Sequence, residues 1–430
     1  MFLFKKRSRR GRRLRRRILC RASLLLLLAS LCADPAALRA GASGLLPGPD
    51  AAASGAAPLL ISFSPVLQTS LPTIKAASPP SVSALSAVLM DADTGALLFC
   101  KNERQRLAMA STTKIMTALL ALESPDPQAS FAVDSASLRV EGTSMGLLPG
   151  DRVTLTDLAV GMLLLSGNDA ANAAAVRLAG SPAAFAAKMN ARAAVLGLSD
   201  THFVTPSGLD DREHFSTAYD MARLGAAALQ NRAFAEICAS SRLSITCGTP
   251  AVTRSFQNHN RLLRELDGCI GIKTGFTKKA GRCLVSACSR QGRRLICVTL
   301  KAPDDWRDHT ALYDYGFSLY TPASLPAQKY RLPIVGGTLS SVSALPSPAP
   351  PLSLRAGEQL TLTARLRPFE YAPVMAGEVV GCLECRVGEC LLQSLPLIAE
   401  ASSPCPTLPN KEKPLNWTKR LFARLRAAFS

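Results

Sequence analysis

Apolar and polar positions divide the chain into segments of different periodicity. Residues 81–103 hold two short apolar runs on either side of Asp93-Thr94-Gly95, a pattern typical of a β-hairpin. In the next segment, 107–123, apolar residues after Ser111 occupy most of the helical circumference, which predicts a buried central helix. Ala-rich helical periodicity then dominates from about Leu155 to Ser240.

Strand patterns return after Ser240. Apolar runs at 271–276, 282–290 and 293–302 predict consecutive strands of an antiparallel meander, and 304–320 predicts a closing helix. Strands at both ends of a region with helices between them indicate an α+β domain whose sheet joins the two ends. We place this domain at residues 81–322.

The pattern changes again after about Ala327. A Pro- and Ser-rich stretch precedes short alternating runs, such as 359–366 and 377–388, which predict a small all-β domain at residues 328–405. Residues 411–430 predict an amphipathic helix with a basic polar face. Such a helix is typical of a membrane surface, although docking on the β domain is the alternative. Its apolar face carries Trp417, Leu421, Phe422, Leu425 and Phe429, and its charges are Lys419, Arg420, Arg424 and Arg426.

The net charge of +19 suggests nucleic-acid binding until the charges are located. Eleven of the 50 basic residues precede the first acid, Asp34, and without them the excess falls to +8. The basic block is followed by the short apolar run 18–33, which is typical of an export signal rather than of a nucleic-acid arm. We therefore assign residues 1–33 to a signal peptide or retained N-terminal membrane segment, and the Ala/Pro/Ser-rich residues 34–80 to a linker.

Cysteine usage leaves several alternatives open. Of 13 cysteines, Cys20 and Cys32 fall in the signal, which leaves an odd number for an oxidising compartment. Cys382 and Cys385 form a CxxC, but no second CxxC or paired histidine follows. The sequence favours buried thiols or a disulfide over a metal site, and it implies no metal or organic cofactor.

Candidate chemistry begins at Ser111-Thr112-Thr113-Lys114. A helix cap would account for a serine at this position, because Ser and Thr satisfy free N–H groups at helix N-termini. The spacing from Ser111 to Lys114 also puts both side chains on one face of a helix, a few ångströms apart. A lysine whose pKa is lowered by burial can take the proton that makes a serine hydroxyl nucleophilic.

Two further motifs have the right chemistry to complete such a site. Ser166-Gly167-Asn168 lies between helical stretches, where a hydroxyl and an amide can pass a proton and hold a substrate amide. Lys273-Thr274-Gly275 lies on a predicted strand, where a cation and a hydroxyl can bind a carboxylate. The glycine permits an extended peptide to approach the strand. Separately the motifs fit a turn and a strand end; their occurrence together indicates one active site.

S-x-x-K, S-x-N and K-T-G in this order are the signatures of the penicillin-recognising serine acyl enzymes. The surrounding sequence resembles the low-molecular-mass penicillin-binding proteins that act as D-alanyl-D-alanine carboxypeptidases. The resemblance covers about residues 84–319 and implies a β-lactamase/transpeptidase-like catalytic domain, with an antiparallel sheet and a helical subdomain. The matching phrases are DADTGALLFCKN, ASTTKIMT, LLLSGNDAANA, LGLSDTHFVTPSGLD, STAYDMARL, GIKTGFTKKAGRCLVSA and DYGF.

The resemblance implies a role for each motif residue. Ser111 would be the nucleophile, Lys114 its base and Ser166 a proton shuttle. The expected substrate-binding residues are Asn168, Lys273, Thr274 and Gly275, and the expected oxyanion-hole donors are the backbone N–H groups of Ser111 and Phe276. Family members also place arginines near the substrate carboxylate. Here Arg307 is a rough candidate, and His259 occupies a place where some relatives carry arginine.

The implied substrate is a peptidoglycan stem peptide ending in D-Ala-D-Ala, and β-lactams would acylate the same serine at the extracytoplasmic face of a bacterial membrane. The alternatives are a D,D-endopeptidase, a β-lactamase of the same superfamily, or a catalytically silent wall- or membrane-binding protein. A separate G-x-S-x-G match at Gly142–Gly146 is a poor nucleophile elbow, because Pro149-Gly150 so soon afterwards opposes the required helix.

Overall fold

The computed structural model of the chain describes residues 61–63, 66–67, 78–349 and 351–407. Within them, five antiparallel strands form the sheet of the predicted α+β domain in the order β4-β3-β11-β10-β9. The predicted hairpin around Asp93 and the predicted meander are confirmed. The strands are β3 (Ser86–Asp91), β4 (Leu97–Lys101), β9 (Cys269–Thr277), β10 (Gly281–Arg290) and β11 (Arg293–Leu300).

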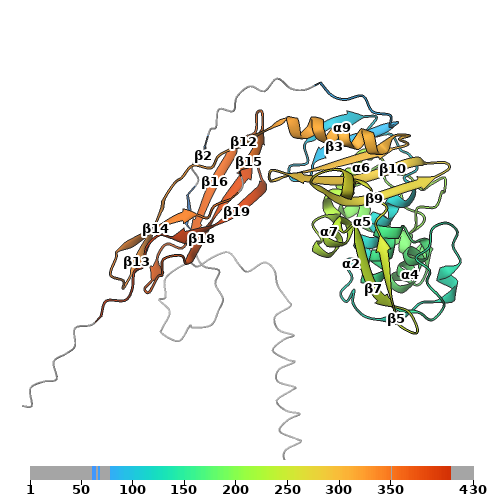
Figure 1. Cartoon of the computed structure of the whole chain (residues 1–430), viewed down its shortest axis with the longest axis horizontal. Helices are drawn as coiled ribbons and strands as arrows, with labels where there is room; N and C mark the ends of the chain where they lie inside the picture. Colours follow the sequence, from blue (N-terminus) through green and yellow to red (C-terminus); the bar gives the residue numbers. More distant parts are fainter. Residues whose placement is uncertain (1–60, 64–65, 68–77, 350, 408–430) are drawn as a thin grey trace, which may run out of the picture. The chain divides into compact units, whose positions relative to one another are not determined.

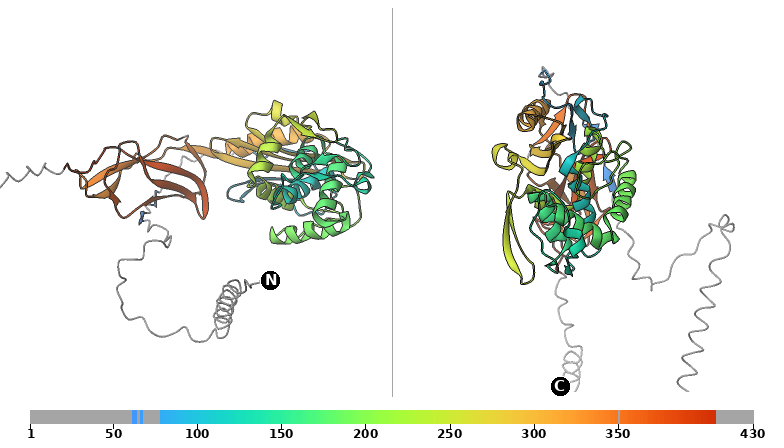
Figure 2. Two further views of the ribbon diagram at one scale, coloured as in Figure 1. Left: turned by 90° about the horizontal axis from the view of Figure 1, so that it is seen from below. Right: turned by 90° about the vertical axis from the view of Figure 1, so that its right-hand side faces the viewer.

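Apolar residues on both faces of this sheet explain why helices cover both sides. On β10, Val285 and Ala287 belong to one apolar cluster, whereas Leu284 and Cys288 belong to another. The first cluster includes α6 (Ala218–Ala228), and the second includes α9 (Asp305–Ser318), the predicted closing helix. Figures 1 and 2 show α9 on one side of the sheet and most of the other helices on the other side, whereas Leu262 of the short helix α8 (Leu262–Glu265) belongs to the α9 cluster. A strand buried on both faces is near-continuously apolar, as the sequence of β10 is.

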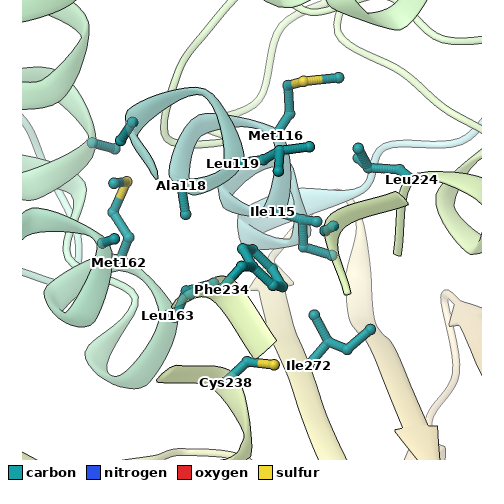
Figure 3. Close-up of a cluster of buried hydrophobic side chains, with 14 of the residues drawn as sticks. Ile115, Met116, Ala118, Leu119, Met162, Leu163, Leu224, Phe234, Cys238 and Ile272 are labelled. Atoms are coloured by element: carbon teal, nitrogen blue, oxygen red, sulfur yellow. The ribbon is translucent and has the colours of Figure 1, made fainter. Parts of the chain in front are cut away.

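The helical part of the domain has α2 (Lys114–Leu122) at its centre, as predicted. Ile115, Met116 and Leu119 are buried, and Figure 3 shows α2 side chains between residues of neighbouring helices and Ile272 of β9. The other helices are α3 (Leu155–Val160), α4 (Asn168–Ala179), α5 (Pro182–Val195), α7 (Arg232–Ala239) and α8 (Leu262–Glu265). Shorter elements are η1 (Ala110–Thr113), η2 (Ser135–Leu138), η3 (Gly161–Leu165), β5 (Phe131–Ala132), β6 (Arg152–Val153), β7 (Arg242–Cys247) and β8 (Val252–Gln257).

A second sheet forms the β domain, with strand order β1-β16-β18-β19-β14-β13-β17 and β2 also paired to β16. Along β16 (Leu360–Leu366) buried and half-buried residues alternate, which is the pattern the sequence displayed. The remaining strands are β13 (Tyr330–Val335), β14 (Ser341–Pro346), β17 (Glu370–Tyr371), β18 (Val379–Val387) and β19 (Cys390–Ala399). β12 (Tyr320–Ala323) and β15 (Leu352–Arg355) form a separate two-stranded ribbon.

The predicted linker 34–80 needs a correction. Its residues include β1 (Ile61–Phe63) and β2 (Val66–Leu67), both paired antiparallel to β16. Two runs this short have too few residues to display a period, so only the available edge of β16 makes them strands. The assigned signal, the rest of the linker to residue 77 and the amphipathic helix 411–430 lie outside the described residues. No helix in the described ranges is long and apolar enough to cross a membrane.

Candidate active site

Ser111 lies in the 3₁₀ turn η1, and its hydroxyl does not cap a helix. No side chain caps either η1 or α2, while the two threonines donate hydrogen bonds to carbonyls of the preceding turn. Thr112 Oγ1 bonds Met109 O at 2.6 Å, and Thr113 Oγ1 bonds Ala110 O at 2.8 Å. Ser111 instead lines a surface cavity. The cap interpretation therefore does not apply to Ser111.

Lys114 is fully buried, and its Nζ has three oxygen partners. It lies 3.0 Å from Ser111 Oγ, 2.6 Å from Asn168 Oδ1 and 2.6 Å from the carbonyl oxygen of Ser207. A carbonyl oxygen only accepts hydrogen bonds, so the last two positions each require an N–H from lysine. A neutral amine has two N–H groups and one lone pair. The lone pair then faces the Ser111 hydroxyl, which is the arrangement required of a general base.

The surroundings of Lys114 favour this neutral form. Burial lowers its pKa well below the usual value, and the nearby charge of Lys273 lowers it further, against a smaller opposing effect of Asp169. The amide orientation of Asn168 follows from its other contact, because Nδ2 donates to Glu141 O at 2.7 Å. Its Oδ1 must therefore face Lys114, and the second Nδ2 hydrogen remains for another acceptor.

The Ser166-Gly167-Asn168 turn joins η3 to α4, between two helical stretches as predicted. Ser166 ends η3 with a left-handed backbone (φ +66°), and Asn168 begins α4 with its N–H bonded to Thr143 O at 2.7 Å. Gly142 (φ +89°) permits this contact, because a Cβ there would lie 2.7 Å from Asn168 Nδ2. The loop around Thr143 is thus fitted against the turn.

Strand β9 forms the opposite wall of the site. A Cβ on Gly275 would lie 3.1 Å from the backbone nitrogens of Ser111 and Thr112, so glycine lets β9 approach Ser111 closely. Lys273 is 1% exposed, and burial lowers its pKa to about 7. Its Nζ donates to Thr274 O at 2.8 Å. Thr274 lines the cavity, whereas Lys273 is not among the lining residues.

The cavity in front of Ser111 has a volume of about 290 Å³ and is lined by residues from every predicted motif. Six residues singled out from the sequence are found in the lining: Ser111, Ser166, Thr274, Gly275, Phe276 and His259. Burial, and then the charge of Lys273, lowers the pKa of His259. Sequence reasoning missed Thr143, Arg282, Asp305 and Trp306, which also line it. Arg307, the rough candidate, is exposed on α9 and is not in this lining.

The sequence profile of the S11 peptidases, described as D-alanyl-D-alanine carboxypeptidase, matches residues 73–304, more than half of the chain. The chain belongs to this family. It is 36% identical over 256 residues to D-alanyl-D-alanine carboxypeptidase DacB2 of Mycobacterium tuberculosis, covering 57% of this chain and 86% of the relative. It is 32% identical to DacC of Escherichia coli, covering 80% of this chain and 90% of the relative.

Solved structures with sequences similar to this chain have the same fold as its α+β domain. The crystal structure of the Streptomyces K15 DD-transpeptidase is 30% identical, with a TM-score of 0.54 over 56% of this chain and all of that chain. DacD of Francisella tularensis, at 24% identity, shows the fold alone, with a TM-score of 0.55 over 79% of this chain and 98% of that chain. The expected α+β catalytic fold, followed by a sheet-rich region, is confirmed.

The family's chemistry leaves no role for the second serine motif. Ser144, at the centre of Gly142–Gly146, lies in a loop with no strand before it and no helix after it. Its Oγ donates to Asp169 Oδ2 at 2.6 Å. The rejection of a nucleophile elbow is therefore confirmed.

Proposed function

We propose that the protein is a serine D,D-carboxypeptidase that removes the terminal D-alanine from peptidoglycan stem peptides through an acyl-enzyme on Ser111. The observation that carries the proposal is the environment of Lys114. In the neutral form that burial favours, two acceptor-only oxygens take the two N–H groups of Lys114, and its lone pair remains for Ser111 Oγ, 3.0 Å away. The reaction that we assign to Ser111 and Lys114 is the one for which the carboxypeptidase family is named.

Acylation begins when Lys114 takes the Ser111 proton and Oγ attacks the carbonyl carbon between the two D-alanines. The carbonyl oxygen becomes an oxyanion, which the N–H groups of Ser111 and Phe276 bind across the short gap between η1 and β9. The C–N bond then breaks, and the proton taken up by Lys114 passes through Ser166 to the departing amine. Water attacks the resulting ester and gives one proton to Lys114; this proton returns to Ser111 Oγ as the ester bond breaks and the shortened peptide leaves.

Substrate binding uses the strand and the turn. The extended peptide lies along β9, where Gly275 has no side chain to obstruct it. The free N–H of Asn168 Nδ2 holds the substrate amide. Thr274 and the cation of Lys273 bind the terminal carboxylate, and a bound anion would raise the pKa of Lys273 from about 7, favouring its charged form.

Labelling with a fluorescent penicillin tests the acyl-enzyme. We expect covalent label on the wild type and none on Ser111→Ala. The matched control is Ser144→Ala, which removes a hydroxyl of the same chain that lies near the site but outside it, and which should label normally. Absence of label on the wild type, or equal label on Ser111→Ala, would overturn the proposal.

Product analysis separates the carboxypeptidase from a second candidate. A D-alanyl-D-alanine endopeptidase of Pseudomonas aeruginosa is 32% identical over 232 residues, so the same site is compatible with cleavage of cross-links. We expect D-alanine release from a stem pentapeptide to exceed cleavage of a cross-linked dimer. The reverse order would assign the protein as an endopeptidase, and rapid turnover of the penicillin itself would indicate a β-lactamase.

We also propose that the enzyme works outside the cytoplasm, because its relatives are named D-alanyl-D-alanine carboxypeptidases and the pattern of residues 1–33 is typical of an export signal. In this proposal residues 411–430 form an amphipathic helix that holds the enzyme to the membrane surface, with its apolar face in the membrane and its basic face against the lipid head groups. Truncation after Pro409 in a signal-processed protein should move the enzyme to the soluble fraction. Unchanged partition with membranes would refute the anchor.

A further inference from the structure

His214 is a buried histidine that the mechanism above does not use, although it lies one hydrogen bond from the Ser111 turn. We infer that His214 is a positioning residue which, through Thr113, fixes the peptide group between Ala110 and Ser111 and thereby aims the Ser111 N–H into the site. The inference rests on the proposed function, because that N–H is one of the two proposed oxyanion donors.

The direction of each hydrogen bond can be assigned from one backbone contact. The N–H of Val204 lies 2.9 Å from His214 Nδ1 and can only donate, so Nδ1 must be an unprotonated acceptor. In the neutral ring the hydrogen is then on Nε2, which donates to Thr113 Oγ1 at 2.8 Å. Thr113 in turn donates its own hydrogen to Ala110 O at 2.8 Å. Each link therefore determines the orientation of the next.

The end of this chain of bonds determines the orientation of the nucleophile's N–H. A trans peptide is planar, so the carbonyl of Ala110 and the N–H of Ser111 point in opposite directions from one rigid unit. On one side, a Cβ on Gly208 would lie 2.0 Å from Ala110 O; on the other, a Cβ on Gly275 would lie 3.1 Å from Ser111 N. Holding the carbonyl toward Thr113 and Gly208 therefore directs the N–H toward β9 and the cavity.

The turn needs such support because its backbone is unusual. Ala110 has φ +50°, in the left-handed region that a residue with a Cβ rarely adopts. A peptide in this conformation reverts to an ordinary one unless its surroundings hold it. The buried hydroxyl of Thr113 and the ring of His214 supply this support at the residue immediately before the nucleophile.

The charge state of His214 agrees with this role. Burial lowers its pKa to about 4; Asp211 opposes this shift, and His202 and Lys279 reinforce it. The ring also contacts Phe203 edge-on. The ring is therefore neutral at the pH at which a wall peptidase works, and Nδ1 remains available to the Val204 N–H.

The test measures penicillin acylation in variants that break the chain of bonds at different links. His214→Phe keeps a ring but cannot donate, Thr113→Val keeps the shape but removes the hydroxyl, and His214→Gln keeps an N–H that can reach Thr113. Leu332→Ala, at a buried position in the β domain, controls for lost stability without touching the turn. Melting temperature is measured for each, and saturation kinetics separate the acylation rate constant from the preceding binding constant.

We expect His214→Phe and Thr113→Val to slow acylation by about 10- to 100-fold, with the binding constant nearly unchanged. This loss is smaller than the loss expected when an oxyanion-hole donor is removed outright. The double variant should be no slower than either single one, because both break the same chain. His214→Gln should recover most of the rate, and Leu332→Ala should acylate normally.

The inference is overturned if folded Thr113→Val acylates at the wild-type rate, or if only the binding constant changes. It is also overturned if Leu332→Ala loses as much acylation rate as the other variants for the same fall in melting temperature. Should His214→Phe fail to fold, Thr113→Val and His214→Gln still decide the matter. Failure of the wild type to label would instead refute the proposed function, and it is distinguishable because it precedes any comparison of variants.

Discussion

Lys273 should destabilise the folded protein in a way that depends on pH. The side chain is 1% exposed, and burial lowers its pKa from 10.5 to about 7. The substitution Lys273→Met keeps an unbranched side chain of similar length and removes the ionisable amine. We therefore expect the variant to be more stable than the wild type at neutral pH, although it loses the cation proposed to bind the substrate carboxylate.

The magnitude follows from the two pKa values. A gap of about 3.5 pH units at about 1.4 kcal/mol each corresponds to a cost of about 5 kcal/mol. Below pH 7 the lysine is protonated in both folded and unfolded chains, so the full cost is present. Between pH 7 and 10.5 only the unfolded chain holds the proton, and the cost falls as pH rises. The neighbouring Lys114 adds to this effect. The charge of Lys273 lowers the pKa of Lys114, so removing that charge also stabilises the folded variant at neutral pH.

Urea unfolding, followed by fluorescence at pH 6.5, 7.5 and 9, measures this effect. The excess stability of Lys273→Met should shrink by about 2 to 3 kcal/mol between pH 6.5 and 9. Lys188→Met removes an exposed lysine of α5 and serves as the matched control, with no such trend expected. An excess that stays constant with pH, or grows toward pH 9, would refute the assignment of Lys273 as a lysine destabilised by burial.

Two other substitutions test the geometry around the nucleophile. Asn168→Asp puts a carboxylate against Lys114 Nζ, which should raise the pKa of Lys114 and move the pH dependence of penicillin acylation to higher pH; an unchanged profile would mean that Lys114 is not the base. Gly208→Ala should destabilise the fold by at least about 3 kcal/mol, because its Cβ would lie 2.0 Å from Ala110 O. Gly95→Ala, also at positive φ but with open space around the Cβ, should cost only about 1 to 2 kcal/mol, and equal losses in urea unfolding would contradict the steric argument.

The three candidate motifs were recognisable because each is local in the sequence. Ser111 and Lys114 are one turn apart, and the apolar pattern of the following residues correctly placed that turn at the start of a buried helix. Similarly, alternating and continuous apolar runs predicted β9, β10 and β11 with their antiparallel order. Their assembly into one site was inferred from their occurrence together and from the family resemblance, and not from the spacing between the motifs.

The supporting contacts were not predictable, because they join residues that are distant in the sequence and ordinary in type. The partner of Lys114 at Ser207 is a backbone carbonyl 93 residues away, and every residue has such a carbonyl. The bond between Thr113 and His214 spans 101 residues. Arg282 and Asp305 line the cavity as a pair separated by 23 residues, which no short pattern marks.

The sequence alone determined the types of the proposed catalytic residues, the helix and strand that carry them, and the order of the two domains. Those properties depend on local periodicity and on side-chain chemistry, which the chain displays directly. The tertiary structure decided that Lys114 is enclosed by two acceptor oxygens, that Gly208 and Gly275 sit on either side of one peptide group, and that β1 and β2 join β16. These outcomes depend on which distant surfaces pack together, and burial then sets the charge states on which the chemistry relies.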